Sequence, residues 1–343
     1  MKRLLNTLYV TGTNRYLSLD GENVVVLEER EEIGRVPLHN LQSIVTFGYT
    51  GASPALMGAC AQRNIDLTFM SGNGRFLARV TGEVKGNVTL RKQQYRVSEN
   101  KEKSISIARN FIFGKVYNAR WILERAARDY PLRLDADKLK EKSAFLYNSL
   151  QEIRTCGDAS KLLGLEGEAA SVYFSVFDQL ILQQKENFSF RERSRRPPLD
   201  NVNALLSFAY SLLAGMCGSA LEAVGLDPYV GFYHKDRPGR ISLALDVMEE
   251  LRGVMADRFV LTLINKRIIK KDHFIQKENG AVILDDSGRK LFLNAWQERK
   301  QDTIKHPFLN EKIEWGMVPH AQAMLLARYL RGDLDEYPPF LWK

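Results

Sequence analysis

The chain places one histidine, His234, in a loop punctuated by glycine and proline, directly before a helical pattern with an acidic stripe. The basic residues around this histidine are Lys235, Arg237 and Arg240. The acidic residues of the stripe are Asp246, Glu249, Glu250 and Asp257. A histidine and carboxylates can bind a divalent metal ion, while neighbouring arginines and lysines neutralise a phosphodiester. The segment therefore favours metal-dependent chemistry on a phosphate backbone.

Each of these residues also has an ordinary structural interpretation. The acidic stripe fits a solvated helix face, and a lone histidine more often makes a structural hydrogen bond than binds a metal. Against this, carboxylates at positions i and i+3 repel one another unless a cation lies between them, and the chain has a net charge of +8. A further candidate, Glu166, is either an acid in the first turn of a helix or a distant ligand. Sequence spacing leaves both interpretations of Glu166 open.

One histidine with carboxylates suits Mg²⁺ or Mn²⁺, which are hard cations that prefer oxygen ligands. An iron oxygenase site would need a second histidine at helical or loop spacing, and zinc hydrolase motifs are absent from the sequence. The other histidines are scattered and receive no role: His39, His273, His306 and His320. The predicted cofactor is therefore Mg²⁺ or Mn²⁺.

The charge of the chain indicates a polyanionic partner. Its net charge of +8 and pI near 9.2 favour nucleic acid or an anionic membrane surface. The residues that we expect to contact DNA phosphates are Arg193, Arg195, Arg196, Arg237 and Arg240. A charge run is also typical of a solvated face, so this expectation depends on the metal-like site that accompanies the arginines.

The composition favours a globular protein of the cytoplasm. The sequence has no run of about 18 uncharged apolar residues, so we expect no membrane span. Its basic N-terminus lacks the sustained apolar core of a signal peptide. The cysteines Cys60, Cys156 and Cys217 are widely spaced, so we expect buried reduced thiols rather than a zinc site or disulfides.

Hydrophobic periodicity changes from about Gln93, which predicts an α+β protein with a domain boundary near residue 86. Residues 1–85 contain β-prone runs, with a hairpin across 20–23, a turn at 71–74 and one helix over 54–63. Helical spacing follows over 104–127, 137–155, 166–185, 201–224, 246–270 and 316–332. A late hairpin within 281–293 is expected to turn at 286–288. We therefore predict a small N-terminal β-rich domain, 1–85, followed by a larger all-α domain, 86–343.

Four ordered motifs resemble those of a known family. They are Gly-Leu-Glu166-Gly, then Arg-Arg-Pro-Pro-Leu-Asp-x-Val-Asn-Ala-Leu-Leu-Ser-Phe-x-Tyr, then Gly-Leu-Asp-Pro-Tyr-Val-Gly-Phe-x-His234, and finally Leu-x-Leu-Asp246-x-Met-Glu249-Glu-x-Arg. Together they resemble the CRISPR-associated spacer-acquisition endonuclease and integrase family, the first of the two near-universal CRISPR adaptation proteins. The resemblance covers essentially the whole chain, and its style is similar to subtype I-C.

The resemblance implies an N-terminal domain that helps to form a homodimer and a helical catalytic domain that binds Mg²⁺ or Mn²⁺. It implies Glu166, His234 and Glu249 as metal ligands and catalytic residues, with Asp246 adjoining them. Glu250 leaves open which of two consecutive glutamates faces the metal.

The implied activity is insertion of new spacer DNA into a CRISPR array, by attack of a 3′-hydroxyl on a phosphodiester. The reverse and hydrolytic reactions cleave branched DNA. The implied partners are double-stranded and branched DNA, a second copy of the chain, a small ferredoxin-like adaptation protein and an associated exonuclease. Two alternatives stay open: a catalytically silent DNA-binding scaffold and a structure-specific DNA repair nuclease.

The C-terminal segment 337–343 contains two prolines and apolar bulk, so it cannot extend a helix. We expect it to help join the chain to the small partner protein, with its aromatic residues exposed. The alternative is that the segment folds back onto its own helical domain.

Overall fold

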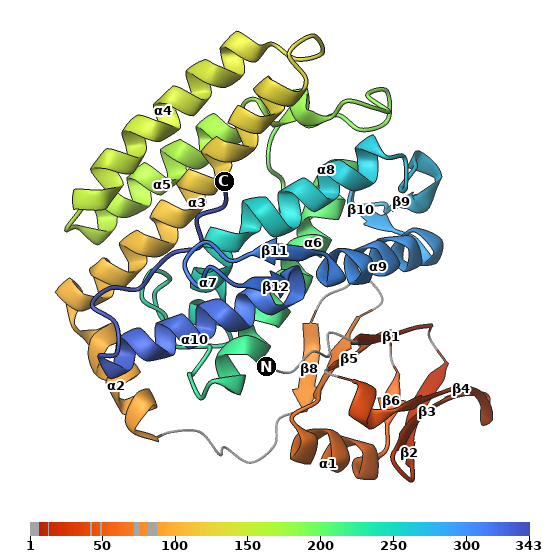
Figure 1. Cartoon of the computed structure of the whole chain (residues 1–343). Coiled ribbons are helices and arrows are strands. Elements are labelled where there is room, and N and C mark those ends of the chain that lie inside the picture. Colours follow the sequence, from red (N-terminus) through yellow and green to blue (C-terminus); the bar gives the residue numbers. More distant parts are fainter. Residues whose placement is uncertain (1–6, 13, 42, 49, 72–75, 81–87) are drawn as a thin grey trace. The chain divides into compact units, whose positions relative to one another are not determined.

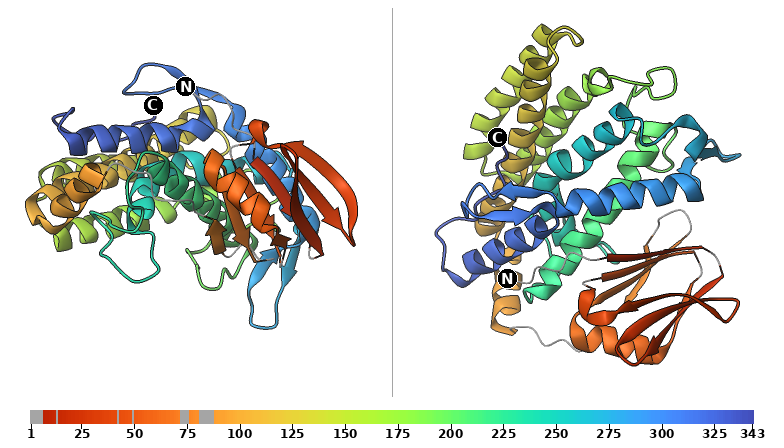
Figure 2. Two further views of the ribbon diagram at one scale, coloured as in Figure 1. Left: turned by 90° about the horizontal axis from the view of Figure 1, so that it is seen from below. Right: turned by 45° about the vertical axis from the view of Figure 1, so that its right-hand side comes forward.

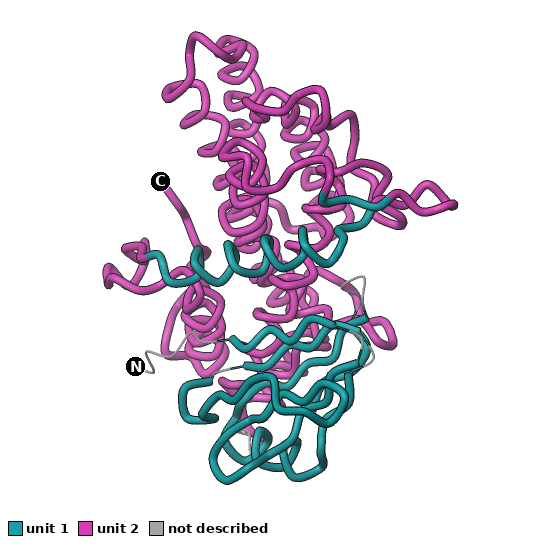
Figure 3. Tube along the Cα trace, turned by 90° about the vertical axis from the view of Figure 1, so that its right-hand side faces the viewer, with its two compact units in different colours: residues 1–85, 273–275, 283–302 teal, residues 86–272, 276–282, 303–343 magenta. Residues whose placement is uncertain are grey.

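The computed structural model describes residues 7–343, apart from 13, 42, 49, 72–75 and 81–87. Most of the predicted turn at 71–74, and the predicted domain boundary between 85 and 86, lie outside the described residues. The chain divides into two compact units, which we describe separately (Figure 3). Unit 1 comprises 1–85, 273–275 and 283–302, and unit 2 comprises 86–272, 276–282 and 303–343.

Unit 1 contains two four-stranded β-sheets among its described residues. The first has the order β1 (Thr7–Thr11), β5 (Ser43–Phe47), β7 (Asp66–Met70), β8 (Phe76–Val80). Its first three strands are parallel, and β8 is antiparallel to β7. The second has the order β4 (Glu31–Pro37), β3 (Asn23–Glu28), β2 (Arg15–Asp20), β6 (Gly51–Ala52). The predicted hairpin across 20–23 is confirmed, because Asp20 pairs with Asn23 where β2 turns into β3.

Helix α1 (Pro54–Arg63) completes the core of unit 1 and has the predicted bounds. The Ser53 hydroxyl caps it by accepting a hydrogen bond from the Leu56 N–H at 3.2 Å, and Pro54 stands in the first turn, where a missing N–H costs no helical hydrogen bond. Fully buried residues from both sheets and from α1 share one cluster: Leu17, Val24, Ile44, Leu56 and Leu67.

The last part of unit 1 differs from the sequence prediction. The late hairpin expected within 281–293 is wrong, because the strand β10 (Val282–Leu284) is followed by a helix, α9 (Asp286–Gln301). The Asp285 carboxylate caps α9 by accepting from the Gly288 N–H at 2.6 Å. The buried apolar residues of α9 recur at helical spacing: Phe292, Leu293 and Trp296. The Asp-Ser-Gly stretch therefore begins a helix instead of forming a β-turn.

Unit 2 is built mainly from helices (Figure 1; Figure 2). Their bounds are α2 (Val88–Glu99), α3 (Lys101–Asp129), α4 (Ala136–Thr155), α5 (Ala159–Phe174), α6 (Asn201–Ala223), α7 (Ser242–Leu251), α8 (Arg258–Asn265) and α10 (Val318–Arg331). Short strands occur late in the chain: β11 (Thr303–Lys305) and β12 (Lys312–Glu314) in unit 2, and β9 (Phe274–Gln276), most of which belongs to unit 1. Short 3₁₀ helices span Phe177–Leu180 and Trp315–Met317 in unit 2, Leu38–Asn40 in unit 1, and Lys271–His273 where the chain passes from unit 2 to unit 1. A β-rich N-terminal region followed by a helical one confirms the predicted α+β class, although the short strands depart from an all-α second part.

Helix α7 packs against α3 and α6 in the interior of unit 2. The interpretation of its acidic stripe as a solvated face is wrong, because Asp246 and Glu250 are 0% exposed and Glu249 is 3% exposed. The helical pattern expected over 246–270 begins earlier, and a π-helical turn, Arg252–Asp257, separates α7 from α8. Such turns occur frequently at functional sites.

Two expectations drawn from composition can be compared with the structure. Helix α6 is long and apolar enough to cross a bilayer by length and composition alone, but 61% of its apolar window is buried inside the structure. Burial of this kind is typical of a core helix, and α6 packs on α7 and α10. The cysteines are free and buried, as expected.

The C-terminal segment folds back onto unit 2. The aromatic residues Tyr337, Phe340 and Trp342 are 1%, 0% and 7% exposed. The Asn118 side chain of α3 donates to the Phe340 carbonyl and accepts from the Trp342 N–H, both at 2.8 Å. The expectation of exposed aromatic residues is therefore wrong, because these side chains find an apolar site on their own helical unit, as the alternative predicted.

Candidate metal and nucleic-acid site

The consecutive glutamates of α7 have different surroundings. Glu249 Oε1 accepts a hydrogen bond from Arg252 Nη2 at 2.6 Å, and its Oε2 lies 2.7 Å from Lys115 Nζ. Glu250 instead accepts hydrogen bonds from the neutral groups Gln322 Nε2 and Tyr337 Oη. Of the two glutamates, Glu249 is therefore the one that faces charged side chains.

Lys115 of α3 brings Glu166 and Glu249 together. Its ammonium group pairs with Glu166 Oε1 and with Glu249 Oε2. The contact is possible because α3 packs against both α5 and α7, although Lys115 and Glu166 are 51 residues apart. Glu166 also lies in the middle of α5, so its interpretation as a first-turn acid is wrong. Two carboxylates that are distant in sequence thus share one cation.

Asp246 holds the histidine loop in place. Its carboxylate accepts backbone N–H groups of Phe232, Tyr233 and His234 at 2.7, 2.9 and 2.9 Å. Its Oδ1 also lies 2.7 Å from His234 Nδ1. Gly231 permits this close approach, because a Cβ there would lie 2.9 Å from Asp246 Oδ2. A carboxylate that already accepts three backbone N–H groups also accepts from the ring, so the imidazole Nδ1 donates to Asp246 and Nε2 is the ring nitrogen left for a ligand.

Tyr233 links the histidine loop to Glu166. Its hydroxyl donates to Glu166 Oε2 at 3.4 Å, and its ring lies 5.1 Å from the His234 ring. Burial, with the neighbouring Glu166 and Glu249 charges, raises the pKa of the Tyr233 hydroxyl well above its usual value, so this group remains a donor at neutral pH. The structure thus places the predicted ligands Glu166, His234 and Glu249 in one neighbourhood of unit 2.

The charge balance around Glu249 favours its ionised form. Burial raises the pKa of this carboxyl, but Arg252 and Lys115 outweigh burial and bring its pKa to about 2. The same ion pair raises the pKa of Arg252. Burial lowers this pKa, but the charge of Glu249 outweighs burial. An ionised, buried carboxylate of this kind either remains in its ion pairs or binds a metal ion.

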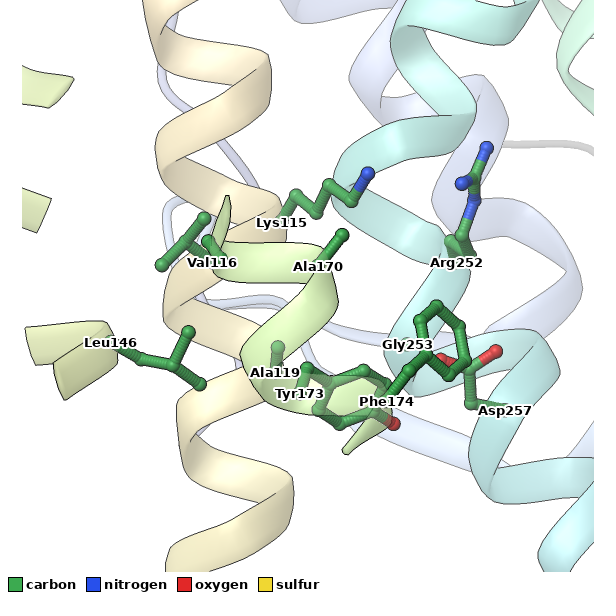
Figure 4. A pocket seen from close by; sticks show the side chains of 11 residues that line it. Lys115, Val116, Ala119, Leu146, Ala170, Tyr173, Phe174, Arg252, Gly253 and Asp257 are labelled. Carbon is green, nitrogen blue, oxygen red and sulfur yellow. The ribbon is translucent and has the colours of Figure 1, made fainter. Parts of the chain in front are cut away.

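A pocket adjoins these charged groups on the side of the π-helical turn. The lining residues include Lys115, Arg252, Asp257, Tyr173 and Phe174 (Figure 4). Asp257 accepts a hydrogen bond from Tyr210 Oη at 2.6 Å. Burial raises the pKa of Asp257, opposed by this hydrogen bond and by Arg252. The pocket therefore combines aromatic surface with the cations that neutralise Glu249.

The donor set suits Mg²⁺ or Mn²⁺. Glu166 and Glu249 offer carboxylate oxygens, and His234 offers Nε2 from a ring oriented by a buried aspartate. The Lys115 ammonium shows that the position between the carboxylates favours a cation. Within the described part of the chain, no three His, Cys, Asp or Glu side chains already form a metal-binding group. A divalent ion would therefore have to displace the Lys115 ammonium.

The arginines predicted to contact DNA fall into two groups. Those that are exposed are Arg195, Arg196 and Arg237. Arg193 is turned inward, since its Nη1 donates to Asn203 Oδ1 at 2.7 Å and burial lowers its pKa. Arg240 is half-buried and donates to the Lys235 carbonyl. The exposed group can reach a phosphate from solvent, whereas Arg193 holds its own segment on α6.

From the sequence alone, Lys115, Tyr233 and Arg252 receive no role, although Arg252 ends the last of the four motifs. Arg252 stands three positions after Glu249 on the same helical face, and this spacing could have identified it. Tyr233 precedes His234, but nothing local distinguishes it from the other loop aromatics. No local signal identifies Lys115, because its role depends on the packing of α3 against α5 and α7.

Comparisons of the whole chain with known sequences agree on one family. The profile of the family described as CRISPR associated protein Cas1 matches residues 8–298. A CRISPR-associated endonuclease Cas1 of Chlorobaculum tepidum is 50% identical over 343 residues, and one of Rhodospirillum rubrum is 52% identical over 347 residues, with both chains fully covered in each case. A fusion of CRISPR-associated exonuclease Cas4 and endonuclease Cas1 of Geobacter sulfurreducens is 36% identical over 340 residues, covering 97% of this chain and 60% of the fusion.

Solved structures share the fold at lower identity. A casposase bound to its integration product has a TM-score of 0.84 at 23% identity, covering 99% of this chain and 95% of the casposase. A chain of a Cas6-RT-Cas1–Cas2 complex has a TM-score of 0.82 at 22% identity, covering 100% of this chain and 36% of that chain. At these identities the likeness shows a common fold.

Proposed function

Because the chain belongs to the CRISPR-associated Cas1 family, we propose that it is a metal-dependent DNA endonuclease and integrase whose site comprises Glu166, His234 and Glu249. The observation that carries the proposal is the meeting of Glu166 and Glu249 at one cation, beside a histidine oriented by a buried aspartate. Full-length similarity to relatives named endonucleases supports nuclease activity.

The proposed ligands of Mg²⁺ or Mn²⁺ are Glu166, Glu249 and the Nε2 of His234. The bound ion would lower the pKa of the attacking hydroxyl and stabilise the charge of the reacting phosphate. Asp246 acts through His234, since it accepts the ring N–H and so fixes the direction of Nε2. Arg252 keeps Glu249 ionised, which a metal ligand requires.

The proposed reaction is a transesterification of DNA. A 3′-hydroxyl attacks a phosphodiester, a new oxygen–phosphorus bond forms, and the bond to the leaving 3′-oxygen breaks. The proton of the attacking hydroxyl goes to solvent, and the leaving oxygen takes one up. Water as the nucleophile gives endonuclease cleavage instead. A casposase with this fold was solved bound to an integration product, which supports strand transfer as the proposed reaction.

The proposed assembly combines DNA, a second copy of the chain and other CRISPR proteins in the cytoplasm. Two copies are needed because insertion at both ends of an array repeat requires two active sites. Residues 1–85 would join the two copies, as the family resemblance implies. A structural relative occurs in a complex with Cas2, and a sequence relative is fused to the exonuclease Cas4, which supports a small ferredoxin-like partner and an exonuclease as partners. Double-stranded and branched DNA would contact the exposed Arg195, Arg196 and Arg237, with Arg240 nearby in the histidine loop.

A strand-transfer assay tests the proposal. A fluorescent duplex with a free 3′-hydroxyl is incubated with a leader–repeat plasmid and the small partner protein, in Mn²⁺ or in EDTA. We expect integration only in Mn²⁺, and a loss of at least about 100-fold in Glu249→Gln. Glu168→Gln is the matched control, since it neutralises an exposed glutamate two residues from Glu166 on α5. Integration in EDTA, or full activity of Glu249→Gln, would contradict the proposal.

The second candidate is a catalytically silent DNA-binding scaffold. The ion pairs of Lys115 and Arg252 favour it, because they already neutralise Glu166 and Glu249. A scaffold would bind DNA without strand transfer at any Mn²⁺ concentration. A repair nuclease would instead cleave branched DNA without requiring either the repeat or the partner protein.

A further inference from the structure

The ammonium of Lys115 lies against both carboxylates that we propose as metal ligands. Its Nζ pairs with Glu166 Oε1 and lies 2.7 Å from Glu249 Oε2, and the Lys115 side chain is 13% exposed. The preceding residue fixes the backbone here, because a Cβ on Gly114 would lie 2.9 Å from Glu250 Cβ and 3.2 Å from Pro339 Cβ. Since α3 is packed this tightly against α7, the ammonium leaves by rotation of its own side chain.

We propose that Lys115 is an exchangeable cation of this site. It neutralises Glu166 and Glu249 while no divalent ion is bound, and it moves to a DNA phosphate when the ion takes its place. This inference rests on the proposed metal site. Two carboxylates this close repel one another unless a positive group separates them, which is the role of Lys115 in the metal-free protein.

Exchange follows from the geometry of the pair. A divalent ion and the ammonium need the same carboxylate oxygens and repel one another, so they cannot both remain between Glu166 and Glu249. Arg252 differs, because it binds the other oxygen of Glu249, Oε1, and can stay in place. A displaced, partly buried ammonium needs a new anion, and the reaction brings one in the form of the DNA phosphate.

The consequence is a thermodynamic coupling between metal and DNA. Without DNA, a divalent ion must displace the Lys115 ammonium and leave it without an anion. The divalent ion therefore binds weakly. With DNA, the phosphate receives the ammonium and the ion binds more tightly. By linkage, the metal must strengthen DNA binding by the same factor. Lys115 therefore disfavours a metal-loaded site until DNA is present.

The test compares Lys115→Met with Lys103→Met, which removes an exposed lysine from the same helix. Mn²⁺ binding is measured by electron paramagnetic resonance of the free ion, with and without a short duplex DNA. We expect DNA to tighten Mn²⁺ binding by about 10-fold in the wild type and in Lys103→Met. Lys115→Met should bind Mn²⁺ about 10-fold more tightly than the wild type without DNA, and DNA should then add little.

Thermal melting in EDTA gives a second readout. Lys115→Met should melt at a lower temperature than the wild type, because its carboxylates lack their cation, and Mn²⁺ should raise its melting temperature more than that of the wild type. A variant that cannot be purified without metal is prepared in Mn²⁺ and then treated with EDTA, and loss of its folded circular dichroism signal supports the inference.

The outcomes separate this inference from the proposed function. If the wild type binds no Mn²⁺ with or without DNA, the proposed function and the inference both fail. If the wild type binds Mn²⁺ but Lys115→Met binds it no more tightly and keeps its coupling to DNA, the inference alone is wrong.

Discussion

Glu249 and Glu250 are neighbours on α7 and are both almost completely buried, yet the groups around them differ in kind. Glu249 lies between the charged side chains of Lys115 and Arg252, which outweigh burial and bring its pKa to about 2. Burial raises the pKa of Glu250 to about 7, because only neutral donors oppose it. Full charges, more than hydrogen bonds alone, therefore keep a buried carboxyl ionised.

The neutral donors around Glu250 belong to a network that attaches the C-terminal segment. Gln322 Nε2 donates to Glu250 Oε1 at 2.9 Å, and the Phe340 N–H donates to Glu250 Oε2 at 2.7 Å. Gln322 Oε1 in turn lies 3.0 Å from His306 Nε2. His306 Nδ1 accepts backbone N–H groups of the β11–β12 loop, so its Nε2 carries the proton and donates. Glu249 of α7 thus belongs to the candidate site, whereas Glu250 is bonded to α10 and to the C-terminal segment.

Removing residues 337–343 disrupts the surroundings of Glu250 and should have the largest effect. The truncation exposes the sites of Tyr337, Phe340 and Trp342 and leaves Glu250 without two of its donors. Burial of each large side chain contributes about 2 kcal/mol, so the loss should exceed about 5 kcal/mol, which is comparable to the whole stability of many domains. Urea unfolding and limited proteolysis measure it.

Removal of Lys343 alone is the control for this truncation. It deletes an exposed terminal residue whose ammonium lies 5.1 Å from the Trp121 ring, and should cost less than about 1 kcal/mol. A truncated protein that unfolds at the same urea concentration as the full chain would show that the segment does not stabilise unit 2.

The free energy of unfolding, measured against pH in EDTA, distinguishes the two glutamates because their contributions change with pH in opposite directions. The folded pKa of Glu250, about 7, lies above its ordinary 4.5, so its stabilising contribution is complete below pH 4.5 and is lost as the pH rises through 7. The folded pKa of Glu249, about 2, lies below 4.5, so its contribution is present above pH 4.5 and is lost as the pH falls toward 2.

Glu250→Gln should therefore remove a decline of about 2 kcal/mol in the free energy of unfolding between about pH 5 and 8. The acid limb that belongs to Glu249 should persist in this variant. Chemical denaturation at a series of pH values measures both limbs. Parallel curves for the wild type and Glu250→Gln would contradict the assignment of the titration to Glu250.

Asp246→Asn tests the Glu249 side of α7 without touching the C-terminal segment. An amide in place of the carboxylate no longer enforces the Nδ1-protonated form of His234, so Mn²⁺ affinity should fall by about 10- to 100-fold. Asp227→Asn is the matched control, because Asp227 accepts the Tyr229 N–H in the same loop at 2.8 Å. Isothermal titration with Mn²⁺ measures the difference, and equal affinities for the two variants would exclude a positioning role for Asp246.

The smallest expected effect is on DNA binding by the exposed arginines, which are not part of α7. Replacing Arg195 and Arg196 together by alanine should lower the slope of log affinity for DNA against log salt by about two. Arg193→Ala should leave that slope nearly unchanged and instead destabilise unit 2, since its guanidinium bonds to Asn203. Fluorescence anisotropy over a salt series distinguishes the two variants. Equal slopes for both would remove the exposed arginines from the proposed DNA surface.

In the N-terminal region, several elements can be predicted from the local sequence. The alternating runs, the 20–23 hairpin and the bounds of α1 all follow from residues close in the chain. Helix ends were predicted less well where a cap was overlooked. Asp158 caps α5 through the Lys161 N–H at 2.7 Å, so this helix begins at Ala159, seven residues before the expected start at 166. The cap at Asp285 has the same effect, because it begins α9 where the local sequence predicts a hairpin.

The chemical types of the residues at the candidate site can be read from the sequence alone. A lone histidine among basic residues, with carboxylates at helical spacing and four ordered motifs, was enough to nominate Glu166, His234, Asp246 and Glu249 and a hard divalent cation. That Glu249 faces Lys115, while Glu250 faces Gln322 and the C-terminal segment, depends instead on the folded structure. The reason is that α3, α5 and α10 supply those neighbours from distant parts of the chain. Which groups meet therefore depends on how the helices pack, and local periodicity carries no information about that packing.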